Sequence, residues 1–124
     1  MHLGNQDIPV PAARQMLSYD KIVGRTVRNI EQALEAQAQG ADYLGVGSIY
    51  PSPTKPDVEV IGLARLGEIR SAVSLPIVAI GGINERNSSQ VIEQGADCIA
   101  IISAVLNSED IETATRILAE QFDY

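Results

Sequence analysis

The chain has 124 residues, enough for one small domain, and a formal net charge of −7. This acidity argues against nucleic acid or an anionic membrane as a general partner. Apolar residues make up 45% of the chain and aromatic residues only 4%. The core is therefore expected to consist of Ile, Val, Leu and Ala, as in layered α/β proteins.

The single cysteine, Cys98, lies in an apolar run and is predicted to be a buried thiol. One cysteine cannot form an internal disulfide, which fits a reducing compartment. The sequence shows no apolar run long enough to span a membrane and no signal pattern at residue 1. These features predict a cytoplasmic protein.

Apolar runs of strand length alternate along the chain with helical periods. Strands are predicted at 21–24, 42–47, 77–80 and 98–103. Because these runs are continuously apolar, both faces of the sheet are expected to be buried. Three predicted helices carry apolar stripes: Ile30, Ala33, Leu34 and Ala38; Leu63, Leu66, Ile69 and Val73; and Ile111, Ala114, Leu118 and Phe122. A further helix is predicted around 86–94.

A four-residue segment occurs twice, as Gln39–Asp42 and as Gln94–Asp97. Each copy closes a predicted helix and opens a predicted strand, and its glycine suits the left-handed position just past a helix end. Four β-α units in series indicate a parallel sheet with crossover helices. Such repeats form either a doubly wound open sheet or part of a (β/α)₈ barrel.

Two loops favour the barrel. The strand at 77–80 ends in Gly81-Gly82, and the strand at 98–103 ends in Ser103-Ala104 before a helix. In (β/α)₈ barrels the loops after the last two strands often bind phosphate through backbone N–H groups. A simple tight turn at Gly81-Gly82 is the alternative, but two such loops in these positions favour phosphate binding.

The loop "IYPSPTKPD" follows the strand predicted at 42–47 and carries three prolines. Proline fixes φ, so Ser52, Thr54 and Lys55 are displayed at low entropic cost. Taken by itself, the loop is equally typical of a stiff, solvated connection with an incidental lysine.

Four segments in order, "HLGNQD", "GADYLGVGSIYPSPTKPD", "LPIVAIGGIN" and "GADCIAIISAV", resemble the thiamine phosphate synthase family. The resemblance implies an α/β fold in which residues 1–124 are one domain made of the last four β/α units of a TIM barrel. It implies the coupling of hydroxymethylpyrimidine diphosphate with thiazole phosphate, in the presence of Mg²⁺, to give thiamine phosphate and pyrophosphate. The first half of the family's pattern, including its other charge-handling residues, has no counterpart in these residues.

The resemblance also implies roles for individual residues. Lys55 is expected to be catalytic and to face the pyrophosphate, with Thr26 nearby. Asp7 is expected to bind magnesium, with helix capping as the alternative. Arg25 and Arg28 are extra cations near this site, or solvated charges at a helix start. The expected thiazole phosphate contacts are Ser52, Thr54, Gly81, Gly82, Ile102 and Ser103.

Half a barrel leaves open strand edges and an uncovered apolar face. We therefore expect a homodimer or a companion half-barrel chain. Two other functions stay open: a non-catalytic phosphate-binding half-barrel, and a TenI-like thiazole tautomerase. In the tautomerase, a histidine occupies the place of Arg28, and arginine is a poor general base because it stays charged.

Overall fold

The computed structural model describes residues 1–122, which contain one five-stranded sheet in the order β1-β2-β3-β4-β5. The strands are β1 (His2–Leu3), β2 (Gly24–Val27), β3 (Tyr43–Val46), β4 (Ile77–Ile80) and β5 (Cys98–Ala100). The helices are α1 (Val10–Met16), α2 (Ile30–Ala38), α3 (Gly62–Ala72), α4 (Ser88–Glu93), α5 (Ser103–Leu106) and α6 (Ile111–Ala119).

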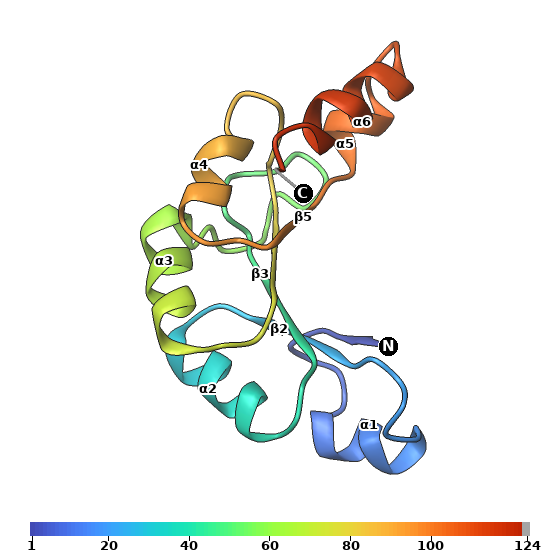
Figure 1. The fold of residues 1–124 in the computed structure, drawn as a ribbon, viewed down its shortest axis with the longest axis vertical. Coiled ribbons are helices and arrows are strands. Elements are labelled where there is room, and N and C mark those ends of the chain that lie inside the picture. Colours follow the sequence, from blue (N-terminus) through green and yellow to red (C-terminus); the bar gives the residue numbers. More distant parts are fainter. Residues whose placement is uncertain (123–124) are drawn as a thin grey trace.

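Strand order and layering decide between the two architectures. Each strand pairs in parallel with the next one in the chain. Figure 1 shows α2, α3 and α4 along one convex side of the sheet. A doubly wound sheet reverses its strand order and carries helices on both faces. The sequential order with helices outside is an arc of a (β/α)₈ barrel, so the predicted fold class is confirmed.

The core lies between the sheet and the helices on its convex side. Leu44 and Ile77 point outward from β3 and β4 and are fully buried, as are Leu66 and Ile69 of α3. The stripe predicted for α3 is thus confirmed. The stripe predicted for α2 is largely wrong, because of its four residues only Ala33 is buried, and Ala36 is the other residue that packs inward.

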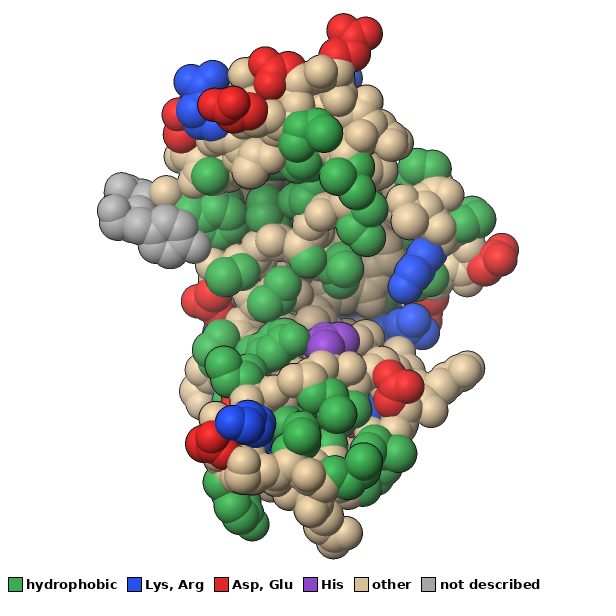
Figure 2. Space-filling view, turned by 90° about the vertical axis from the view of Figure 1, so that its right-hand side faces the viewer, with side chains coloured by type: hydrophobic (Ala, Val, Ile, Leu, Met, Phe, Trp, Pro, Cys, Tyr) green, Lys and Arg blue, Asp and Glu red, His purple; other side chains and the backbone are tan. Residues whose placement is uncertain are grey.

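The concave face of the sheet is open, contrary to the prediction of burial on both faces. Along β4, Ala79 is fully buried on the convex side, whereas Ile80 on the concave side is 38% exposed. Figure 2 shows hydrophobic side chains gathered on this hollowed face. The predicted buried thiol is also wrong, because Cys98 lies on the edge strand β5 and is exposed.

Strand β2 begins three residues later than the predicted run 21–24. Val23 is fully buried, but its N–H donates to the Asp42 side chain instead of entering the strand ladder. The strand then continues through Arg25 and Thr26, whose polarity hid it from a search for apolar runs.

The repeated Gln-Gly-Ala-Asp segment forms the same structure twice at the amino ends of the strands. Gly40 and Gly95 have φ values of 89° and 99°, which confirms the left-handed position after α2 and α4. Asp42 accepts hydrogen bonds from the Val23 N–H and from Arg14, at 2.7 and 2.6 Å.

Asp97 repeats this arrangement with Ile77 and Arg70, at 2.8 and 3.0 Å. Each aspartate therefore joins the start of the preceding strand to an arginine on a helix further back in the chain. The repeat is a structural device that fastens successive β/α units together.

A side chain caps the last helix, α6. The Asp110 side chain accepts a hydrogen bond from the Thr113 N–H at 3.0 Å, and this bond lowers the pKa of Asp110. On the predicted apolar stripe Leu118 is buried, but Ile111 is 49% exposed. Within residues 1–122, no helix is long and apolar enough to cross a membrane.

Candidate functional site

A cavity of about 560 Å³ opens on the concave face and extends to the loops at the carboxyl ends of the strands. Parallel strands bring these loops to the same edge of a sheet, although they are far apart in sequence. All nine predicted site residues line the cavity: Asp7, Thr26, Ser52, Thr54, Lys55, Gly81, Gly82, Ile102 and Ser103. The structure therefore brings them together, while their individual roles stay predictions.

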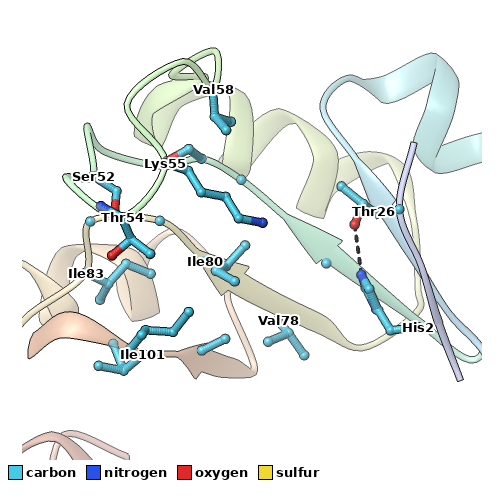
Figure 3. Close-up of a pocket in the computed structure, with 18 of the residues that line it drawn as sticks. His2, Thr26, Ser52, Thr54, Lys55, Val58, Val78, Ile80, Ile83 and Ile101 are labelled. Atoms are coloured by element: carbon cyan, nitrogen blue, oxygen red, sulfur yellow. Dashed lines mark hydrogen bonds between the residues drawn. The ribbon is translucent and has the colours of Figure 1, made fainter. Parts of the chain in front are cut away.

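The proline-rich loop supplies the cation of this site. In Figure 3 the Lys55 side chain extends from the loop over the cavity, and Ser52 and Thr54 lie beside it. The Thr54 N–H donates to Ser52 Oγ at 3.3 Å, which closes a local turn. Lys55 is exposed, and its side chain makes no hydrogen bond or ion pair with the described residues, so the ammonium is available to an anion.

Gly81 and Gly82 have φ values of 104° and 65°, so both occupy the left-handed region. A side chain at Gly81 would come within 2.1 Å of Ser48 Oγ, and one at Gly82 within 2.4 Å of the Pro51 carbonyl oxygen. The Tyr50 N–H also donates to the Gly81 carbonyl at 3.0 Å. Gly81 and Gly82 therefore do form the tight turn that the sequence allowed. The same turn places the backbone of both glycines at the cavity wall, where it can also bind phosphate.

Asp7 stands at the cavity and does not cap a helix. The residue before α1 is Pro9, and no side chain caps that helix, so the capping alternative is wrong. Asp7 Oδ2 accepts a hydrogen bond from the Gly4 N–H at 2.6 Å, which fixes the carboxylate.

The described residues contain no cluster of three or more His, Cys, Asp or Glu side chains able to hold a metal ion. Mg²⁺ is commonly bound by one or two carboxylates together with waters and substrate phosphates. A single fixed carboxylate beside candidate phosphate sites fits that kind of binding.

Sequence reasoning missed a polar cluster at the amino side of the cavity. His2 Nε2 lies 2.8 Å from Thr26 Oγ1, drawn as a dashed line in Figure 3. His2 Nδ1 lies 2.9 Å from the Tyr43 hydroxyl, and the two rings stack with centroids 5.6 Å apart. Burial lowers the pKa of His2, which therefore favours the neutral imidazole.

A glycine makes this cluster possible. Gly24 lies between His2 and Tyr43 in the strand register. A side chain there would come within 2.0 Å of the Tyr43 ring. Gly24 was the residue in the sequence that could have indicated this cluster. Its position between His2 and Tyr43 on neighbouring strands becomes apparent only when the strand register is known.

Strand alternation separates the two arginines that the sequence left undecided. Successive residues of a strand point to opposite faces. Arg25 donates to the carbonyl groups of Gly4 and Ile8, at 3.0 and 3.2 Å, so it is a structural residue. Arg28, just past the end of β2, lines the cavity together with Thr26.

Residues 1–105 match the family model described as thiamine monophosphate synthase. The chain belongs to this family. The thiamine-phosphate synthase of Clostridium acetobutylicum is 45% identical over 118 residues, which are 95% of this chain and 56% of the relative. The enzyme of the same name from Pyrococcus horikoshii is 49% identical over 115 residues, covering 93% of this chain and 55% of the relative.

Solved structures agree with the family. A thiamine phosphate pyrophosphorylase from Pyrococcus furiosus superimposes with a TM-score of 0.88 at 44% identity, covering 97% of this chain and 57% of that one. A 3-hexulose-6-phosphate synthase, at 21% identity and a TM-score of 0.72, shares the fold alone. The chain thus spans a little over half the length of the thiamine-phosphate synthases that it matches. The resemblance seen in the sequence is confirmed.

Proposed function

We propose that the chain acts in thiamine phosphate synthesis, coupling hydroxymethylpyrimidine diphosphate with thiazole phosphate. One observation carries this proposal: nine residues from separate segments of a thiamine monophosphate synthase family member converge on one cavity. In the reaction the bond between the pyrimidine methylene carbon and the diphosphate oxygen breaks, and its electron pair leaves with pyrophosphate. The thiazole nitrogen then forms the new bond to that carbon.

The site suits a reaction that releases a polyanion. The Lys55 ammonium stabilises the charge developing on the departing pyrophosphate, and the Thr26 hydroxyl can donate to it. Backbone groups at Gly81, Gly82 and Ser103, with the hydroxyls of Ser52 and Thr54, hold the thiazole phosphate. Asp7 would bind Mg²⁺, which neutralises phosphate charge when present.

The alternatives have less support. A tautomerase needs a general base where Arg28 stands, and the nearby His2 is already engaged with Thr26 and Tyr43. A non-catalytic phosphate-binding half-barrel would keep the cavity and lack turnover. The observation in favour of this alternative is that the cavity is lined by only one carboxylate and one lysine, which are few charged groups for catalysis.

The test is formation of thiamine phosphate from the two substrates with Mg²⁺, comparing the chain with two lysine variants. Lys55→Ala should lower turnover about a hundredfold or more, because a charge-stabilising group at the leaving anion is lost. Lys21→Ala is the matched control, since Lys21 is exposed and pairs with Asp20 outside the cavity.

Product formed equally by all three proteins would remove the role of Lys55. Saturable binding of thiazole phosphate without product would favour the non-catalytic alternative.

A further inference from the structure

Arg28 differs from the other half-buried arginines of the described chain in having no partner. Arg14 and Arg70, whose side chains are 12% and 26% exposed, each bind an aspartate and backbone carbonyls. Arg65 pairs with Glu59, and Arg25 binds two carbonyls. The Arg28 Nε atom is buried, and the side chain has no hydrogen-bond partner among residues 1–122.

A buried donor without a partner is costly, so it calls for a physical explanation. The Arg28 backbone is fixed, because its N–H donates to Gln32 Oε1 at 2.8 Å at the start of α2. The side chain therefore projects from a defined point at the carboxyl end of β2, where it lines the cavity. Because the side chain lines the cavity and has no protein partner, we expect the guanidinium to bind a ligand there.

The charges of the cavity indicate the chemistry of that partner. The chain as a whole carries a net charge of −7. The cavity is lined by two permanent cations, Arg28 and Lys55, and one carboxylate, Asp7. His2 adds no charge at neutral pH, because burial lowers its pKa. A local excess of positive charge in an acidic protein favours an anion.

We propose that Arg28 binds the diphosphate of the pyrimidine substrate and the pyrophosphate that it releases, opposite the thiazole phosphate loops. This inference rests on the proposed function. The guanidinium offers several N–H donors in a planar fork that matches phosphate oxygens, and its charge is permanent. Arg28 is thus a second cation for the leaving group, on the loop after β2, whereas Lys55 comes from the loop after β3.

The experiment measures binding of magnesium pyrophosphate to the full chain by calorimetry. Arg28→Met keeps an unbranched apolar stem and removes the guanidinium with its charge, and it should weaken binding roughly tenfold to a hundredfold, the range for a lost charged hydrogen bond. Arg28→Lys should restore only part of the affinity, because the fork is absent. Arg116→Met is the matched control, because Arg116 is exposed on α6 and lies outside the cavity. The affinity of this variant for magnesium pyrophosphate should stay within about twofold of that of the parent chain.

A second readout does not depend on the variants. The Nε–H resonance of Arg28 in ¹⁵N-labelled protein should shift and exchange more slowly with water when magnesium pyrophosphate is added. Equal affinity of Arg28→Met and the parent chain, absence of saturable binding, or an unshifted Nε–H resonance at saturation would each overturn the inference. Loss of pyrophosphate binding in Arg28→Met without formation of thiamine phosphate by the parent chain would instead contradict the proposed function alone.

Discussion

At the scale of single residues, His2 shows how local packing sets protonation. Its imidazole is held between the Tyr43 hydroxyl and Thr26 Oγ1. Burial is the largest influence on its pKa and lowers it from 6.5, against the opposing effect of Asp7. The cluster therefore presents a neutral ring beside the cavity.

We expect the free energy of unfolding to fall as the pH drops below about 6.5. The unfolded chain binds a proton on His2 there, whereas the folded chain resists it until its lower pKa is reached. Because His2 is the only histidine, the titration of its ring protons can be followed directly by NMR. Tyr43→Phe, which removes the partner of Nδ1, serves for comparison. A midpoint at or above 6.5 would contradict this account.

Most of the candidate site could be predicted because each of its residues lies in a recognisable motif. Lys55, Gly81 and Ser103 are examples, and all three line the cavity. The pairing of His2 with Tyr43 could not be predicted, because it depends on strand register and on the missing side chain at Gly24. The contrast between Arg25 and Arg28 likewise depended on where β2 begins.

At the scale of elements, the two Asp-Arg networks fasten successive β/α units at the amino ends of the strands. Asp42→Asn should lower the free energy of unfolding by about 1–2 kcal/mol, an estimate reduced for its partial exposure. Asp97→Asn should have a similar effect, because its contacts repeat those of Asp42. The two effects should nearly add, since the networks share no residue. Urea unfolding of the two single variants and of the double variant measures these effects, and Asp57→Asn, in an exposed loop, is the control.

The Asp42 network also has a pH signature. The Val23 N–H first, and then Arg14, lower the pKa of Asp42 below 3.8. Its contribution to stability is therefore complete above about pH 4 and disappears as the pH falls through the folded pKa. A parent chain and Asp42→Asn variant that lose stability in parallel across this range would contradict the assignment.

Helix and strand order could be predicted from periodicity, but strand bounds could not. The strand predicted at 98–103 extends only to Ala100 in the structure. Strand β2 begins after the predicted start, because the Val23 N–H donates to the Asp42 side chain and not to a neighbouring strand. Contacts made by side chains of distant residues are not encoded in local hydrophobicity. The helical pattern also failed to predict that Leu34 of α2 is exposed.

At the scale of the whole molecule, the arc of five strands leaves a concave face and two strand edges uncovered. Ile80 and Ile102 on this face are 38% and 49% exposed. Exposed apolar surface and open parallel edges both favour association. We propose that the chain pairs with a second copy or with a companion half-barrel.

Light scattering after gel filtration at micromolar concentration should give a mass above that of the single 13.3 kDa chain. The mass should fall on dilution if the partner is a second copy. A concentration-independent monomer would contradict pairing with a second copy. The apolar strand runs wrongly predicted burial on both faces of the sheet. The resemblance to half a barrel predicted the open face, because four β/α units cannot close a barrel of eight.

The central claim is that phosphates bind at the loops on the carboxyl ends of the strands. We would test it by adding thiazole phosphate to ¹⁵N-labelled protein and following the backbone amides by NMR. The account predicts that the largest shifts converge on residues 52–55, 81–82 and 102–103, which line one cavity. Shifts concentrated at the opposite end of the sheet, around Asp42 and Asp97, or no saturable shifts at all, would contradict it.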